Sequence, residues 1–182
     1  MSIVWLACYN ADMEEIELTF LPKELPAGVF GSKSKELLDI YLPAGAVHPK
    51  LRVRRSGTTH EITKKQAVQE GDASHQIETT IPLTPEEFAD LEKLEGKRVH
   101  KTRYYYAENG IDYEVDVFQD ALQGLVLVDI EFTTLADKAA FVAPSWLLAE
   151  VTQEEFIAGG MLCGKRYEDI AERLQAFGYV RK

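Results

Sequence analysis

The sequence has little of what marks a secreted or membrane-spanning protein. Its two cysteines, Cys8 and Cys163, are too few and too far apart for a disulfide framework or a CxxC metal site. No apolar run is long enough to cross a bilayer, and the apolar Met1–Cys8 segment lacks the basic residues that open a secretory signal. We therefore expect a cytoplasmic protein with reduced thiols and no membrane partner.

Positive charge is also scarce. The chain has 20 Lys and Arg against 30 Asp and Glu, whereas nucleic-acid binding needs a cationic surface that displaces phosphate counterions. We therefore expect no nucleic-acid partner. The two signs are also separated, because Lys and Arg crowd into residues 50–103 while residues 104–137 contain acidic residues and no Lys or Arg. This separation makes the spacing of the charges informative.

Polar and apolar residues alternate in several short segments of the chain. The alternation covers residues 15–20, 51–54, 76–78, 99–103, 113–117 and 128–132. A period of two is typical of β-strands with two chemically different faces. Turn signals at Ser56-Gly57, Asn109-Gly110 and Gln123-Gly124 join neighbouring strands, so the sheet is predicted to be antiparallel.

Helix signals interrupt and follow these strands. The pair Thr84-Pro85 predicts a helix to about Leu94, and Thr134 caps a short predicted helix to about Val142. A capping box at residues 152–155 and an apolar stripe over residues 167–177 predict two more helices. We therefore expect an α+β fold: one domain over residues 1–182, with a helical segment over about 153–182.

The polar faces of the strands carry pairs of like charge, whereas a solvent-facing surface usually mixes the two signs. A sheet of about eight strands that closes into a barrel turns every second residue inward. The pattern therefore predicts a closed antiparallel β-barrel with flanking helices and a charged tunnel interior. The like-charged pairs that would line the tunnel are Arg52 with Arg54, Lys101 with Arg103, Glu114 with Asp116, and Asp129 with Glu131.

Cations and carboxylates inside one tunnel suit a triphosphate-containing small molecule. Arg offers a planar fork for phosphate oxygens, and Lys offers a compact point charge. Carboxylates hold Mg²⁺ or Mn²⁺, and the metal in turn joins substrate phosphates to the protein. The outward apolar faces of the strands also need cover, which helices or a second copy of the chain in a homodimer would supply.

The ordered set of motifs resembles the CYTH superfamily, the triphosphate tunnel metalloenzymes. Two positions within the motifs depart from the family pattern: Thr19 stands where the ExExK motif has Lys, and Asp129 stands for the first Glu of ExEF. A further family strand, which often carries Arg and two acids, departs as well, because Ser74, Gln76 and Glu78 retain only the last carboxylate. The motifs run in the family's order from residue 15 to residue 152: Glu15-Ile16-Glu17 for ExE, Arg52-Val53-Arg54 for RxR, Ile62–Lys65 for a strand that ends in Lys, Lys101-Thr102-Arg103 for KxR, Glu114–Phe118 for ExDxF, Asp129–Phe132 for ExEF, and Glu150-Val151-Thr152 for a short segment after the barrel.

What the resemblance implies is a divalent-metal-dependent hydrolase of phosphoanhydrides, with inorganic tripolyphosphatase as the first choice of activity. The implied roles follow by position. Glu15, Glu17, Asp129 and Glu131 would hold the metal, Arg52, Arg54, Lys65, Lys101 and Arg103 would bind the substrate, and Glu15, Glu17 and Glu114 would take part in catalysis.

Other activities stay open at this point. Adenylate cyclase-like and thiamine-triphosphatase-like enzymes occur in the same superfamily. Thr19, together with Gln76 in place of a further acid, is also compatible with a module that binds polyphosphate or a nucleotide without turnover. Cyclic AMP made from ATP would indicate a cyclase, and tight binding without hydrolysis would indicate the binding module.

Overall fold

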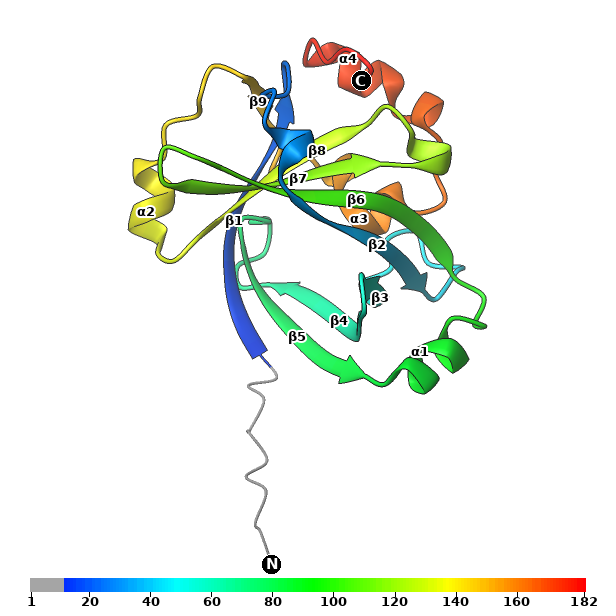
Figure 1. Ribbon diagram of the computed structural model, residues 1–182. Coiled ribbons are helices and arrows are strands. Elements are labelled where there is room, and N and C mark those ends of the chain that lie inside the picture. The colour runs from blue at the N-terminus through cyan, green and yellow to red at the C-terminus, as the bar shows by residue number, and fades with distance from the viewer. Residues whose placement is uncertain (1–11) are drawn as a thin grey trace, which may run out of the picture.

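The computed structural model describes residues 12–182, and the Met1–Cys8 segment considered above lies outside them. Within the described residues the prediction of a closed antiparallel barrel is confirmed (Figure 1). The strands follow the order β5-β4-β3-β2-β6-β7-β8-β1, and a β5–β1 pairing closes the ring. The strands are β1 (Asp12–Pro22), β2 (Lys33–Leu42), β3 (Leu51–Ser56), β4 (Thr59–Ala67), β5 (His75–Leu83), β6 (Lys97–Glu108), β7 (Ile111–Phe118) and β8 (Val126–Phe132).

Strand β1 lies at the seam of the barrel. Its residues 12–16 pair with β5, and its residues 16–20 pair with β8. A short ninth strand, β9 (Leu147–Glu150), pairs with the end of β1 from Phe20 to Pro22. The alternating residues Glu15, Glu17 and Thr19 of β1 therefore all face the interior at the place where the ring closes.

The predicted turns join the strands as expected. The β3–β4 turn holds Gly57 at φ 59°, and the β6–β7 turn holds Asn109 at φ 53° and Gly110 at φ 78°. These backbone angles are positive, which is the reason for Gly and Asn at these positions. A 3-10 turn, η2 (Asp120–Leu122), and Gly124 connect β7 to β8.

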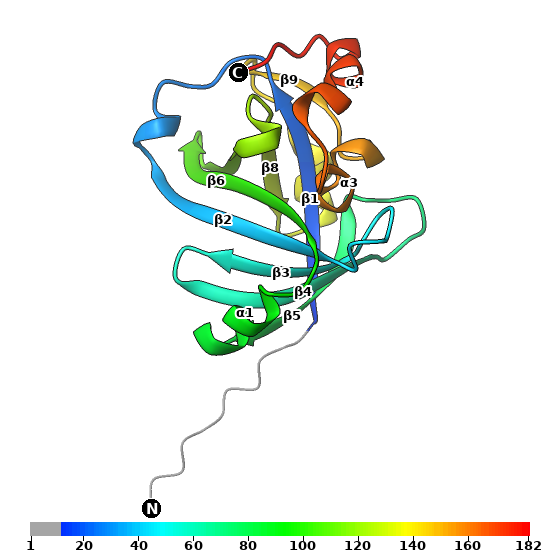
Figure 2. The same ribbon diagram turned by 90° about the vertical axis from the view of Figure 1, so that its right-hand side faces the viewer.

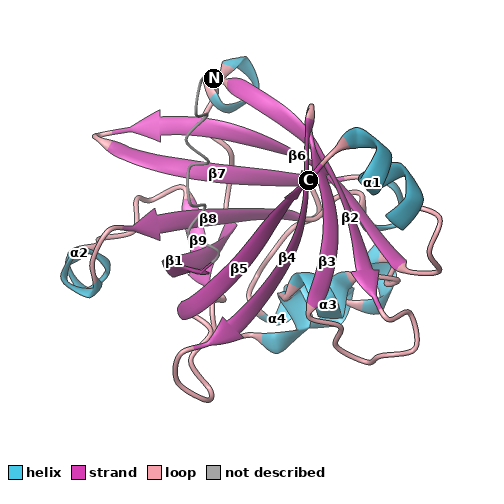
Figure 3. Ribbon diagram, turned by 90° about the horizontal axis from the view of Figure 1, so that it is seen from below, coloured by secondary structure: helices cyan, strands magenta, loops and turns pink. Residues whose placement is uncertain are grey.

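The first helix, α1 (Pro85–Leu91), packs on the outside of the barrel. Thr84 and Glu87 form the predicted capping box, and the helix ends before the predicted Leu94. Its Phe88 lies in one apolar cluster with Ile40 and Val53, so α1 covers outward residues of β2 and β3. Helix α2 (Leu135–Ala140) begins after the predicted cap Thr134 and lies on the other flank of the barrel (Figure 3).

The C-terminal segment differs from the prediction in two places. Thr152 does not cap a helix, because its hydroxyl accepts a hydrogen bond from the Thr19 backbone N–H at 3.0 Å inside the barrel. Residues 167–177 form two short elements instead of one helix. The segment consists of η3 (Glu155–Ile157), α3 (Gly159–Leu162), η4 (Tyr167–Asp169) and α4 (Ala171–Ala176).

The apolar stripe that predicted the last helix is nevertheless buried. Tyr167, Ile170 and Leu174 lie in one cluster with the buried Leu125 and Leu162, which fixes the C-terminal segment to one end of the barrel (Figure 2). A small 3-10 turn, η1 (Val29–Gly31), precedes β2. Across residues 12–182 we find no helix with the length and apolar character needed to cross a membrane.

Candidate active site in the barrel interior

The barrel encloses a cavity of about 820 Å³. Inward side chains of the strands form most of its wall, and residues between Gln153 and Leu162 cover one side. Glu114 is not part of the wall; it forms an ion pair with Arg103 instead. The other predicted site residues all line this one cavity: Glu15, Glu17, Arg52, Arg54, Lys65, Lys101, Arg103, Asp129 and Glu131.

Arg54 is held by a buried carboxylate. Its Nε donates to Asp39 Oδ1 at 2.6 Å, and its Nη2 donates to Asp39 Oδ2 at 2.7 Å. Burial alone would raise the pKa of Asp39, but the charges of Arg54 and Arg52 outweigh it and hold that pKa below its usual range. Asp39 was missed by sequence reasoning, because it lies in the mostly apolar run from Leu37 to Leu42 and shows no charge alternation.

A second buried carboxylate, Asp116, holds the two cations of β6. Arg103 donates to it through Nε and Nη2, both at 2.7 Å, and Lys101 forms a further ion pair with it. Burial would raise the pKa of Asp116, but the charges of Arg103 and Lys101 hold it below its usual range. The position was visible in the ExDxF pattern, although its role as the common partner of both cations was not.

Arg52 is the least engaged of these three arginines. Its Nε donates to Thr63 Oγ1 at 2.9 Å. Its remaining partners are more distant, at 3.4 Å from Nη2 to Glu78 Oε2 and 3.9 Å from Nη1 to Asp39 Oδ2. The Arg52 guanidinium can therefore donate hydrogen bonds to a phosphate with little loss of its existing bonds.

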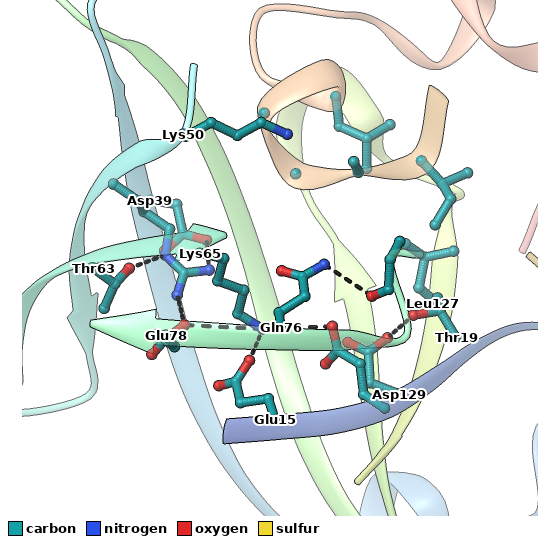
Figure 4. Close-up of a pocket in the computed structure, with 18 of the residues that line it drawn as sticks. Glu15, Thr19, Asp39, Lys50, Thr63, Lys65, Gln76, Glu78, Leu127 and Asp129 are labelled. Carbon is teal, nitrogen blue, oxygen red and sulfur yellow. Dashed lines mark hydrogen bonds and ion pairs between the residues drawn. The ribbon is translucent and has the colours of Figure 1, made fainter. Parts of the chain in front are cut away.

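Lys65 lies between carboxylates of two strands (Figure 4). Its Nζ forms ion pairs with Glu15 and with Glu17, at 3.5 Å from Glu17 Oε1, and approaches Glu78 at 3.9 Å. Burial would lower the pKa of Lys65, but the charges of Glu17 and Glu15 raise it above its usual value. Lys65 therefore carries its charge in the cavity, while its neighbour Lys64 is exposed and lies in register with Leu51 of β3 and Thr79 of β5.

The carboxylates around β1 and β8 are crowded. Burial and the charges of Glu114, Glu15 and Glu17 raise the pKa of Glu131 to about 6. Burial and the charge of Glu17 raise the pKa of Asp129 as well. Crowded carboxylate oxygens are the donors that Mg²⁺ and Mn²⁺ prefer, so this set fits a divalent cation.

The carboxylates are not already arranged around a metal position. Among residues 12–182 no group of three or more His, Cys, Asp or Glu side chains has the geometry that would hold a metal ion. Instead, Lys65 contacts Glu15 and Glu17, and Arg103 Nη2 donates to Asp129 Oδ2 at 3.3 Å. The cations of the chain therefore balance these carboxylates in this structure.

No protein-family model matches this sequence. A search of curated proteins nevertheless finds an inorganic triphosphatase of Nitrosomonas europaea, which is 36% identical over 145 residues. The alignment covers 79% of this chain and 92% of that protein.

Two solved structures share the fold. A structure of the hypothetical protein NE1496 is 32% identical with a TM-score of 0.62, and the match covers 84% of this chain and 99% of that one. A structure of the inorganic triphosphatase NE1496 is 30% identical with a TM-score of 0.60, and the match covers 82% and 93%. With the charged barrel interior and the ordered motifs, these similarities show that the chain belongs to the CYTH superfamily, the triphosphate tunnel metalloenzymes.

Proposed function

We propose that the chain is a divalent-metal-dependent hydrolase of triphosphate compounds and that inorganic tripolyphosphate is its preferred substrate. The observation that carries this proposal is the cavity inside the barrel, whose wall combines Arg52 and Lys65 with the carboxylates of β1 and β8. The inorganic triphosphatase of Nitrosomonas europaea, 36% identical to this chain, supports the choice of substrate.

The charge of the cavity explains why a metal would be required. Among the described residues that line it, ten are Asp or Glu and seven are Lys or Arg. A triphosphate adds several negative charges to a wall that already has more carboxylates than cations, so Coulomb repulsion opposes its entry alone. We therefore propose that substrate and divalent cations occupy the cavity together.

Each side of the cavity would have its own part in the reaction. Arg52, Arg54, Lys65, Lys101 and Arg103 would bind and orient the phosphate oxygens, and Glu15, Glu17, Asp129 and Glu131 would hold the metal. When bound there, a divalent metal would stabilise the charge on the transferring phosphoryl group. Glu114 would act only through Arg103, which it contacts. Water is the nucleophile of a hydrolysis, so no covalent nucleophile on the protein is needed.

Orthophosphate release tests the activity directly. Tripolyphosphate, thiamine triphosphate and ATP are each offered with Mg²⁺ or Mn²⁺, and a parallel series contains excess chelator. We expect the highest kcat/KM with tripolyphosphate and no release in the chelator series. Cyclic AMP from ATP without tripolyphosphate hydrolysis would instead identify a cyclase, and tight binding without any turnover would identify a binding module.

The double substitution Glu15→Gln with Glu17→Gln tests the metal side of the site. It keeps the shape of both side chains but replaces charged oxygens with amides, which bind divalent cations weakly. Loss of a group that merely supports a metal ligand costs about 10–100-fold, so we expect metal-dependent turnover to fall at least ~100-fold.

A matched control lies on the same strand. Glu14 is an exposed residue of β1 with its side chain on the outer face, in register with Ile77. Glu14→Gln makes the same kind of change once on β1, outside the cavity, so its kinetics should equal those of the wild type. Wild-type metal dependence in the Glu15 and Glu17 double variant would show that the metal binds elsewhere.

A further inference from the structure

Two of the departures from the family motifs, at Thr19 and Asp129, occur at one place in the barrel. Thr19 of β1 stands for the Lys of ExExK, and Asp129 of β8 stands for the first Glu of ExEF. The β1–β8 register pairs these two residues directly, and both side chains line the cavity. Two changes that look unrelated in the sequence are therefore one change in the structure.

The side chains of Thr19 and Asp129 are hydrogen-bonded to each other (Figure 4). Thr19 Oγ1 donates to Asp129 Oδ1 at 2.8 Å, and Thr19 is only 8% exposed. The other oxygen, Asp129 Oδ2, accepts from Arg103 Nη2 at 3.3 Å. The Thr19 backbone N–H is itself held by Thr152, so the hydroxyl starts from a fixed position. Two donors on different strands thus set the plane of the Asp129 carboxylate.

We propose that Thr19 is a positioning residue that fixes Asp129 for a divalent cation and, being uncharged, adds no further positive charge beside Asp129 and Glu17 that would repel that cation. The inference rests on the proposed function, because it takes Asp129 as a metal ligand. It concerns a role that the motif pattern alone does not assign, since at this position the pattern has Lys.

Thr and Lys at position 19 would have opposite effects on the binding of a divalent cation. A hydroxyl hydrogen bond orients a carboxylate but leaves its net charge, so a cation can still bind the remaining lone pairs. An ammonium at position 19 would lie beside the same carboxylate and would repel a divalent cation at short range. Thr19 is therefore expected to favour metal binding relative to Lys at the same position.

Binding of Mn²⁺ without substrate tests this proposal by titration calorimetry. Thr19→Ser keeps the hydroxyl and should bind Mn²⁺ within about twofold of the wild type. Thr19→Val keeps the shape but loses the donor, so the affinity should fall by about 3–10-fold, as expected for the loss of one typical hydrogen bond. Thr19→Lys adds the repelling charge and should weaken binding at least ~10-fold.

A control threonine comes from the outside of the barrel. The Thr102 hydroxyl accepts from Gln119 Nε2 at 2.6 Å and does not line the cavity, so Thr102→Val should leave Mn²⁺ affinity unchanged. Thermal unfolding checks that every variant folds. If Thr19→Lys does not fold, the comparison of Thr19→Val with Thr19→Ser still tests whether the hydroxyl positions Asp129.

The outcomes separate this inference from the proposed function. Wild-type Mn²⁺ affinity in Thr19→Val overturns the positioning role, and wild-type affinity in a folded Thr19→Lys overturns the role of its neutrality. A wild-type protein that binds no Mn²⁺ contradicts the metal requirement of the proposed function and this inference with it. A wild-type protein that binds Mn²⁺ but does not hydrolyse tripolyphosphate contradicts the proposed activity alone.

Discussion

Arg52→Ala is expected to lower kcat/KM for tripolyphosphate by at least ~100-fold while the protein stays folded. The Arg52 fork has one short bond, to Thr63, and two carboxylate neighbours at 3.4 and 3.9 Å. A substrate phosphate can therefore gain charge-assisted bonds from it, and each is worth about 1.5–3 kcal/mol, with 1.4 kcal/mol corresponding to tenfold. Steady-state kinetics and a thermal unfolding curve measure the two effects together.

The neighbouring arginine supplies a matched control. Arg55 lies on the same strand with its side chain outward, where it pairs with the exposed Glu36 at 3.4 Å. Arg55→Ala removes an equal charge and should leave kcat/KM unchanged. Arg52→Lys keeps the charge without the planar fork and should fall between the wild type and Arg52→Ala. Wild-type kinetics in Arg52→Ala would refute the role of this strand in phosphate binding.

The alternation of charged and apolar residues was enough to predict the barrel, because closure of a sheet turns one face of every strand inward. It was not enough for β2, where Asp39 stands alone among apolar residues. The interior of this strand is apolar apart from that carboxylate, so the sequence shows no period of two. The partner of Arg54 could therefore be found only from the structure.

The ion pairs inside the cavity could not be predicted from the sequence either. The spacing placed Arg54 and Arg103 on an inner face, but it could not tell whether their forks were free or already bonded. In the structure both forks meet buried carboxylates at 2.6–2.7 Å. Thr152 shows the same limit. Its local sequence predicts a helix cap, but its hydroxyl instead accepts a hydrogen bond from Thr19 of β1, 133 residues away in the chain.

Because of these pairings, substitutions of the two arginines Arg52 and Arg54 are expected to have different effects on stability. Removing Arg52 breaks few bonds, whereas removing Arg54 leaves Asp39, which is 1% exposed, without its main partner. An unpaired buried charge is strongly destabilising. Loss of activity in an Arg54 variant would therefore mix lost substrate binding with lost stability, and Arg52 is the cleaner probe of phosphate binding.

The largest effect on stability is expected from Asp116→Ala, which should lower the free energy of unfolding by about 3–5 kcal/mol, as measured for broken buried pairs. Asp116 is 1% exposed and is the common partner of Arg103 and Lys101. Its removal leaves two buried cations with one shared carboxylate fewer, and burial already lowers the pKa of Lys101. Urea unfolding at neutral pH measures the loss.

Asp112 provides the control on the same strand, since it is exposed and lies near the β6–β7 turn. Asp112→Ala should change the free energy of unfolding by less than about 0.5 kcal/mol, the usual range for surface substitutions. If Asp116→Ala loses no more than Asp112→Ala, Arg103 and Lys101 must be stabilised by water or by Glu114 and Asp129 instead. The larger loss would mean that Asp116 offsets the cost of burying both cations, Lys101 and Arg103, inside the barrel.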